Sequence, residues 1–346
     1  MFSILKPFLF KLDPETAHDL AIKSLKFNPL PSKLFDVEDE QMLNIKLFGK
    51  NFANPIGLAA GFDKSAEAYS QLLNLGFGFV EIGTVTPQKQ FGNPKPRIFR
   101  LEEDEALINR LGFNNDGMEV IKKRINLEDK KGVLGINIGP NSDTKNQKED
   151  FCKGLDFFYD VADYITINIS SPNTKKLRDF HDGEQLKDLL NTLNKVKKEK
   201  KTSVPLLLKV SPDIKENEIS EVADIAIKNN ISAIILTNTT NHNRENLFSG
   251  IKEEGGLSGK PLTEISTKMI KLFYKELNNK IPIIGVGGID SAKSAYEKII
   301  AGASLLQLYT GFVYKGPTIA KVIKKDLIKI LKNEGIKNIK DIIGQG

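Results

Sequence analysis

Cysteine is almost absent from this chain, because Cys152 is the single one among 346 residues. One cysteine excludes an internal disulfide, a two-cysteine redox motif and a cysteine-ligated metal cluster, and it favours a reducing compartment. The three histidines, His18, His181 and His242, lie too far apart in the sequence to suggest a histidine metal site. We therefore expect no metal in this protein.

Long apolar runs are also absent. No stretch of eighteen apolar residues occurs, so no helix is expected to span a bilayer. The chain begins MFSILKPFLFKLDP, where Lys6 and Pro7 interrupt the apolar run. No small-residue cleavage site follows, which argues against a signal peptide.

Arginine is scarce relative to lysine, and no arginine-rich or aromatic-interleaved patch predicts a nucleic-acid groove. The net charge of +6 falls largely on lysines of predicted helices, as in 195–201 and 321–332. We interpret these lysines as solvated helix faces. A basic protein can still prefer an anionic membrane surface.

Eight short, apolar, β-branched runs alternate with amphipathic segments of helical period. Such runs are typical of a parallel sheet covered on both faces, so the pattern predicts an α/β fold, a closed (β/α)8 TIM barrel. The glycine fingerprint of a doubly wound open sheet is weak, because the candidate at 285–288 comes late and Asp290 stands at the third glycine position. Strands are expected at 55–59, 79–84, 133–138, 164–169, 206–210, 233–237, 281–286 and 305–309. Helices are expected at 66–75, 150–161, 184–198, 216–229, 263–277 and 292–300.

The first forty residues carry apolar faces at helical spacing that a complete barrel does not need. Asp13 is expected to cap a second helix that Pro14 opens, and Pro29 and Pro31 end it. We predict a helical extension at 1–40, which either plugs the bottom of the barrel or rests on lipid and admits a lipophilic substrate. The barrel is then expected at 41–335 and a C-terminal tail, without an assigned role, at 336–346.

Polar residues gather at the predicted strand ends, where such barrels carry their chemistry. The fourth strand runs into the segment 168–174, which brings two amides and three hydroxyls to one strand tip. A capped turn would by itself explain that composition. Lys209, inside an apolar strand, needs either a structural ion pair or an anionic ligand, and we favour the ligand. Lys64, after the first strand, offers a cation to a carboxylate.

Glycine-rich turns follow the seventh and eighth strands, at 285–289 and 307–311. Backbone N–H groups in such turns, each leading into a helix, form the usual phosphate site of a barrel. A phosphate site, a buried lysine and several amides together suggest flavin mononucleotide (FMN). Lys209 could then stabilise negative charge on the pyrimidine edge of the reduced flavin.

A series of motifs resembles the dihydroorotate dehydrogenases, specifically the quinone-dependent, membrane-associated class 2. In order these are LDPETAH, NPIGLAAGFDK, EIGTVTP, FRLEEDEALINRLGFNN, GINIG, INISSPNT, LLLKVSPD, TNTT, GGLSGKPL, IIGVGGI and QLYTGF. Each motif alone is weak, but together they are specific and cover nearly the whole chain. The resemblance implies a (β/α)8 barrel that holds one FMN behind an N-terminal helical extension.

The resemblance also implies the site residues. FMN would be bound by Ala60, Gly61, Phe62, Asp63, Lys64, Thr84, Asn137, Asn168, Lys209, Thr237, Gly259, Gly288, Tyr309 and Thr310. Dihydroorotate would be held by Lys64, Asn109, Arg110, Leu111, Gly112, Phe113, Asn168, Asn173, Asn238 and Thr239. Ser171 stands where class 2 members carry the catalytic base. His18 and Arg100 match positions that line the quinone tunnel, and Tyr309 lies where tunnel and flavin meet.

The implied reaction oxidises dihydroorotate to orotate in de novo pyrimidine synthesis. Ser171 would take the C5 proton while C6 delivers hydride to flavin N5, and ubiquinone or menaquinone would reoxidise the flavin through the N-terminal helices. A serine hydroxyl is a poor base at neutral pH, so we expect a relay through Thr174 and water, with Phe113 sealing the site. The resemblance further implies a monomer, attached peripherally to the cytoplasmic side of the cell membrane. From the composition we expect no nucleic-acid partner.

Three alternatives stay open. Cytosolic dihydroorotate dehydrogenases, linked to fumarate or NAD, use cysteine as the base and lack the N-terminal extension, whereas this chain has Ser171. Flavin barrels that resemble tRNA-dihydrouridine synthases also use cysteine and append an RNA-binding module. A non-catalytic flavin-binding barrel would not need Lys64, Ser171, Asn173 and Lys209 together.

Overall fold

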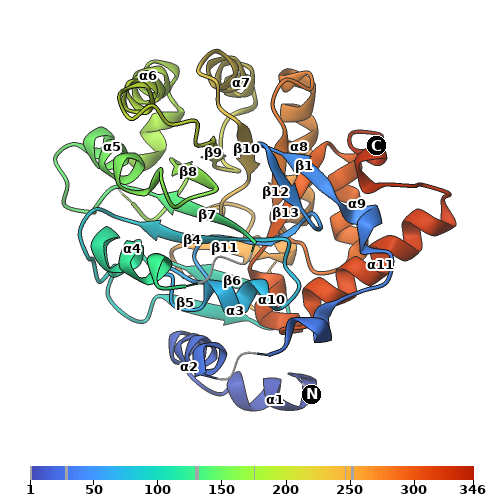
Figure 1. The fold of residues 1–346 in the computed structure, drawn as a ribbon. Helices are drawn as coiled ribbons and strands as arrows, with labels where there is room; N and C mark the ends of the chain where they lie inside the picture. Colours follow the sequence, from blue (N-terminus) through green and yellow to red (C-terminus); the bar gives the residue numbers. More distant parts are fainter. Residues whose placement is uncertain (1, 28–29, 129–131, 175, 246, 251–252) are drawn as a thin grey trace.

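The computed structural model describes all residues except 1, 28–29, 129–131, 175, 246 and 251–252. Eight parallel strands close into a barrel in the order β10-β12-β13-β3-β4-β7-β8-β9 (Figure 1). Every residue of these strands is buried, which explains their continuous apolar sequences. The predicted barrel is confirmed, and each strand lies within two residues of its expected bounds. The strands are β3 (Ile56–Leu58), β4 (Phe79–Val85), β7 (Val133–Ile138), β8 (Tyr164–Asn168), β9 (Leu206–Val210), β10 (Ala233–Leu236), β12 (Ile283–Val286) and β13 (Ala303–Leu308).

Helices surround the barrel (Figure 1). They are α3 (Tyr69–Leu73), α4 (Met118–Asn126), α5 (Gln147–Phe158), α6 (Gly183–Glu199), α7 (Ile219–Lys228), α8 (Thr263–Leu277), α9 (Ala292–Ile300), α10 (Thr310–Lys315) and α11 (Ile319–Asn333). The helix expected at 66–75 is wrong in its first part. The Asp63 carboxylate accepts the N–H groups of Glu67 and Ala68, both at 2.8 Å, and Ala66 is left-handed with φ 53°. These contacts hold a turn where the apolar pattern suggested a helix.

Two small sheets, not expected from the sequence, cover the two ends of the barrel. A hairpin of β1 (Ile45–Leu47) and β2 (Lys50–Phe52) covers the amino-terminal end, where Phe52 packs edge-on against Phe79, the first residue of β4, at 5.4 Å. An antiparallel sheet of β5 (Ile98–Leu101), β6 (Ala106–Asn109) and β11 (Gly256–Gly259) lies at the carboxyl end. Its residues Ile98, Leu107 and Ser258 line the cleft described below.

The N-terminal helices α1 (Phe2–Leu9) and α2 (Pro14–Phe27) lie on the side of β5 and α10 (Figure 1). The expected cap is confirmed, since Asp13 Oδ1 accepts the N–H groups of Glu15 and Thr16 at 3.1 and 3.0 Å. The ring of His18 packs against Phe62, just after β3, at 4.8 Å. Because β3 ends there, α2 sits at the carboxyl end, and the plug alternative for the barrel bottom is wrong. Within the described ranges, no helix has the length and apolar character needed to cross a membrane.

The C-terminal tail packs against the barrel helices. The N–H groups of Gly344 and Gly346 donate to the carbonyl oxygens of Ile299 and Ile300, at 3.1 and 2.8 Å. Ile339 and Ile342, in the short 3₁₀ helix η6 (Ile339–Ile342), are buried. The tail is therefore part of the folded unit.

One lysine of the helix faces that were expected to be solvated is buried. Lys324, in the run 321–332, is only 2% exposed and pairs with Glu40 Oε1 at 2.8 Å. Glu40 lies in the 3₁₀ helix η2 (Glu40–Leu43), and the same oxygen also accepts a bond from Asn54. Here the interpretation of a solvated face is wrong, because α11 turns Lys324 toward the segment that precedes the barrel.

Candidate functional site

A cleft opens where the barrel strands end, between these ends and the sheet of β5, β6 and β11. It encloses about 1110 Å³, including the part open to solvent. Most residues proposed from the sequence line this one cleft. They are Ala60, Gly61, Lys64, Thr84, Asn109, Leu111, Gly112, Phe113, Asn168, Ser171, Asn173, Lys209, Thr237, Asn238, Thr239, Gly288, Tyr309 and Thr310.

A buried carboxylate, Glu81, lies at the centre of the polar network beneath the cleft. Its Oε1 accepts a bond from Asn137 Nδ2 at 2.8 Å. Its Oε2 accepts bonds at 2.8 to 3.1 Å from Gln307, Tyr164 and Thr166. The sequence analysis assigned no role to Glu81, although an acidic residue inside the apolar strand β4 is the same kind of signal that identified Lys209.

An amide and hydroxyl ladder connects this carboxylate to the cleft. Asn137 Oδ1 accepts bonds from Thr84 Oγ1 at 2.6 Å and from Asn168 Nδ2 at 3.2 Å. Asn168 Nδ2 also donates to Thr84 at 3.0 Å. Asn137 is fully buried and does not reach the cleft surface, so it orients Thr84 and Asn168, which do.

Two lysines line the cleft, Lys209 from β9 and Lys64 from the loop after β3, and the ammonium group of neither makes a hydrogen bond to a described residue. Burial lowers the pKa of Lys209, and the charge of Glu81 acts in the opposite direction. Burial lowers the pKa of Lys64 to about 8, and the charge of Glu15 opposes this effect. A buried ammonium group requires an anion or several acceptors, so this cleft is built for an anionic, hydrogen-bonding ligand.

A turn with positive φ values lies at Gly287 and Gly288, after β12. Both residues have positive φ, at 115° and 68°, and a Cβ on Gly288 would meet Thr263 Oγ1 at 2.1 Å. Their N–H groups donate no hydrogen bond within the described part of the chain. Backbone amides of this kind are suited to a phosphate.

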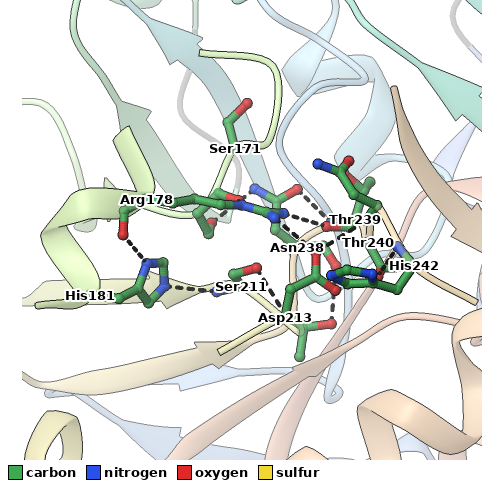
Figure 2. A network of polar contacts seen from close by, with 12 residues as sticks. Ser171, Arg178, His181, Ser211, Asp213, Asn238, Thr239, Thr240 and His242 are labelled. Carbon is green, nitrogen blue, oxygen red and sulfur yellow. Dashed lines mark hydrogen bonds and ion pairs between the residues drawn. The ribbon is translucent and has the colours of Figure 1, made fainter. Parts of the chain in front are cut away.

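Ser171 lines the cleft, and Figure 2 shows its side chain pointing away from the polar network below it. Its Oγ accepts the N–H of Asn173 at 3.3 Å. The ring of His181 is engaged elsewhere, with Nδ1 at 2.9 Å from the carbonyl oxygen of Arg178 and Nε2 at 3.2 Å from the Ser211 N–H. No bond joins Thr174 to Ser171 among the described residues, so the relay stays a prediction.

Several residues proposed for the ligands lie outside the cleft lining. Asp63 holds the turn before α3, and Gly259 packs so closely that a Cβ would meet the Glu105 carbonyl oxygen at 2.4 Å. Phe62 packs against Tyr309, with ring centroids 5.7 Å apart. Arg110 pairs with Glu253 at 2.8 Å and so braces the loop before β11. These four residues support the lining in this structure.

The two residues matched to a quinone tunnel lie where α1 and α2 meet the barrel. Arg100 donates to the carbonyl oxygens of Leu9, at 3.3 Å, and of Leu12, and its guanidinium stacks over Phe10. His18 contacts Phe62, which contacts Tyr309 in turn. This aromatic series runs from α2 to the cleft.

The same helix is held by an ion pair that the sequence analysis missed. The Glu15 carboxylate accepts hydrogen bonds from Arg97 Nη2 at 2.6 Å and from Arg97 Nε at 3.0 Å, and both side chains are largely buried. Its signal in the sequence was faint, because the partners lie 82 positions apart.

The stability of the protein is expected to depend on His18 below neutral pH. Burial and then the charge of Lys64 lower its pKa to about 3, while the backbone of Phe62 and the charge of Glu15 act oppositely. A histidine in the unfolded chain titrates near 6.5, so the unfolded state binds the proton first as the pH falls. The contribution of neutral His18 to the free energy of unfolding is therefore fully present above about pH 6.5 and is lost as the pH falls toward 3.

Between pH 7.5 and 5.5, the free energy of unfolding of the unmodified protein should fall by about 1 kcal/mol more than that of the His18→Gln variant. Urea unfolding at the two pH values measures this. The matched control is His242→Gln, which removes an exposed histidine from the loop after β10. An identical pH dependence in His18→Gln and the unmodified protein would contradict the assignment.

Comparison with known proteins agrees with this geometry. The family model described as "Dihydroorotate dehydrogenase" matches residues 42–331. A protein of Bartonella tribocorum named "Dihydroorotate dehydrogenase (quinone)" is 48% identical over 96% of this chain and 93% of its own length. A protein of the same name from Idiomarina loihiensis is 47% identical, over 94% and 100%. The crystal structure of DHODH from Eimeria tenella in complex with ferulenol superposes with a TM-score of 0.91, at 40% identity, over 96% and 95% of the two chains.

Proposed function

This chain belongs to the dihydroorotate dehydrogenase family, and we propose that it oxidises (S)-dihydroorotate to orotate, with FMN as cofactor and a quinone as electron acceptor. The observation that carries the proposal is the pair of lysines, Lys64 and Lys209, that line the same cleft as Ser171 and whose ammonium groups make no hydrogen bond or ion pair with the described residues. Dihydroorotate carries a carboxylate, and both FMN and dihydroorotate have amide edges. The cleft therefore offers matching charges and hydrogen-bonding groups.

The residues present fit FMN. The amides of Gly287 and Gly288, which bond to none of the described residues, suit its phosphate, while Lys209, Thr84 and Asn168 suit its pyrimidine edge. At Gly61, φ is 99°, which favours glycine, and the lack of a side chain leaves the backbone open to a flat group. When bound, FMN would accept the hydride from C6 of the substrate and later pass the electrons to the quinone.

The substrate would be held on the other side of the cleft. Lys64 supplies the cation for the carboxylate, and the side chains of Asn109, Asn173 and Asn238 supply hydrogen bonds to the ring amides. Asn173 Nδ2 already donates to the Asn109 carbonyl oxygen at 3.0 Å, which holds the two asparagines together. Ser171 Oγ would accept the C5 proton as the C5–C6 double bond forms.

The quinone would arrive between the N-terminal helices and the barrel. Large apolar side chains are exposed on these helices, including Ile4 at 71% and Phe8 at 67%. Others are Leu5, Leu20 and Phe27 on the helices and Leu12 between them. We propose that this face rests on the cytoplasmic side of the cell membrane and that the protein is attached peripherally, as a monomer.

The experiment that tests the function is anaerobic. The purified yellow protein is mixed with dihydroorotate, and flavin absorbance is followed before a soluble quinone, fumarate or NAD is added in separate cuvettes. We expect bleaching and then recovery with quinone alone. Recovery with fumarate or NAD would contradict quinone as the electron acceptor and identify the other acceptor instead. Failure to bleach would contradict the substrate.

A further inference from the structure

Arg178 connects three of the loops at the carboxyl end of the barrel (Figure 2). It lies in the 3₁₀ helix η3 (Leu177–His181), after β8. Its Nε donates to the Ser170 carbonyl oxygen at 3.1 Å, and its Nη2 donates to the Thr239 carbonyl oxygen at 3.1 Å. Its Nη1 pairs with Asp213 Oδ2 at 2.8 Å. Each of the three guanidinium nitrogens thus donates a hydrogen bond to a different loop.

Asp213 extends the same connection. Its carboxylate also accepts the hydroxyl of Thr240 and, at 3.0 Å, the N–H of Asn241. The ion pair therefore joins the loop after β9, which carries Asp213, to the loop after β10. Both side chains are partly buried, Asp213 more than Arg178, so solvent screens this pair less than a surface pair.

The ring of His181 fixes η3 from the other side. A carbonyl oxygen only accepts hydrogen bonds, so His181 Nδ1 donates to the Arg178 carbonyl oxygen and Nε2 accepts the Ser211 N–H. The loop after β8 is thereby bound to the loop after β9 through both the His181 ring and the Arg178 side chain.

Neither Arg178 nor Asp213 belongs to the cleft lining, but the loops they join supply much of it. Ser171 and Asn173 come from one loop, and Asn238 and Thr239 from another. The carbonyl that receives Arg178 Nε is that of Ser170, in the peptide unit that precedes Ser171. Ser170 Oγ is in turn bonded to Asn238 Nδ2 at 2.9 Å. The orientation of that peptide sets where Ser171 Oγ stands.

We propose that Arg178 and Asp213 are positioning residues, whose ion pair holds the Ser171 loop so that its hydroxyl stands over the C5 proton of bound dihydroorotate. The inference rests on the proposed function, because it requires Ser171 to be the base. Neither side chain touches the reacting atoms, so both act through Ser171. Misplacement of a reacting group by about 1 Å can cost about 100-fold in rate.

The test is a double-mutant cycle read in the reductive half-reaction by anaerobic stopped flow. We expect Arg178→Ala to lower the limiting rate of flavin reduction about 100-fold. In a Ser171→Ala background the same change should lower the residual rate less than about threefold, because the base it positions is gone. The quinone half-reaction, starting from chemically reduced enzyme, should stay within about twofold. Added guanidinium ion should restore part of the rate in Arg178→Ala alone.

Two further variants keep the test decisive if Arg178→Ala folds poorly. Asp213→Asn keeps the shape of the carboxylate but removes its charge, and we expect a loss of the same sign. Lys122→Ala is the matched control, since Lys122, in α4, also bonds to a carboxylate, that of Asp160, and to a carbonyl oxygen, that of Phe157, at the end of α5 and far from the cleft lining. It should leave both half-reactions unchanged.

Equal losses from Arg178→Ala with and without Ser171 would overturn the inference and leave a purely structural ion pair. A loss shared by the quinone half-reaction would overturn it as well. If the unmodified protein is not reduced by dihydroorotate, the proposed function itself fails, and that result is visible before any variant is made.

Discussion

Ser171→Ala is expected to slow the reduction of bound FMN by dihydroorotate by about 10²- to 10⁴-fold, the usual contribution of a positioned general base. Ser171 lies in the cleft, and its Oγ accepts a single bond, from the Asn173 N–H. Its other lone pair and its proton are free within the described residues. Stopped-flow absorbance under anaerobic conditions measures the effect, and the rate of reoxidation by quinone should not change.

Ser170→Ala is the matched control for this prediction. The Ser170 hydroxyl is buried, donates to Asn168 Oδ1 at 2.9 Å and accepts from Asn238, and it does not line the cleft. Losing these bonds disturbs the positions of two site residues but removes no base, so we expect a loss below about tenfold. A Ser171→Ala protein that reduces its flavin at the normal rate would rule out Ser171 as the base.

Removal of residues 1–30 is expected to spare flavin reduction and to slow turnover with a long-chain quinone by roughly 100-fold or more. Each large apolar contact is worth about 2 kcal/mol, so the loss of two such contacts exceeds the roughly 2.8 kcal/mol that a 100-fold factor represents. The truncation should stop before Phe35 and Glu40, because Phe35 is buried and Glu40 pairs with Lys324. A longer deletion would damage the barrel itself.

The truncation also removes Glu15, whose charge raises the pKa of Lys64. The two half-reactions should therefore be compared near pH 6.5, so that Lys64 stays protonated without Glu15. A variant with Ile4→Ser and Phe8→Ser provides the control, because it keeps the helices but removes exposed apolar groups. It should lose binding to lipid vesicles and keep turnover with a short soluble quinone. Equal loss of both half-reactions in the truncated protein would contradict a role in quinone access.

The sequence alone determined the barrel and most of the cleft. Each barrel strand is buried on both faces, so its apolar run is continuous and can be seen without knowledge of its neighbours. The segment 168–174 and Lys209 were visible for a similar reason, since polar groups at the end of such a run, or inside it, require a partner. Parallel strands then bring all these ends to one edge, which is why separate motifs predicted a common site.

Tertiary structure alone decided which distant groups meet. Glu81 gathers four donors from β7, β8 and β13, Glu15 finds Arg97 across 82 positions, and Lys324 turns from an apparent solvent face to Glu40. The place of α2 at the carboxyl end and the connection from Arg178 to Asp213 were likewise invisible. Local spacing determines which face a residue lies on, because it follows from the backbone period. Contacts between loops that are distant in sequence depend on how the helices and strands pack against one another, and no local sequence pattern predicts that packing.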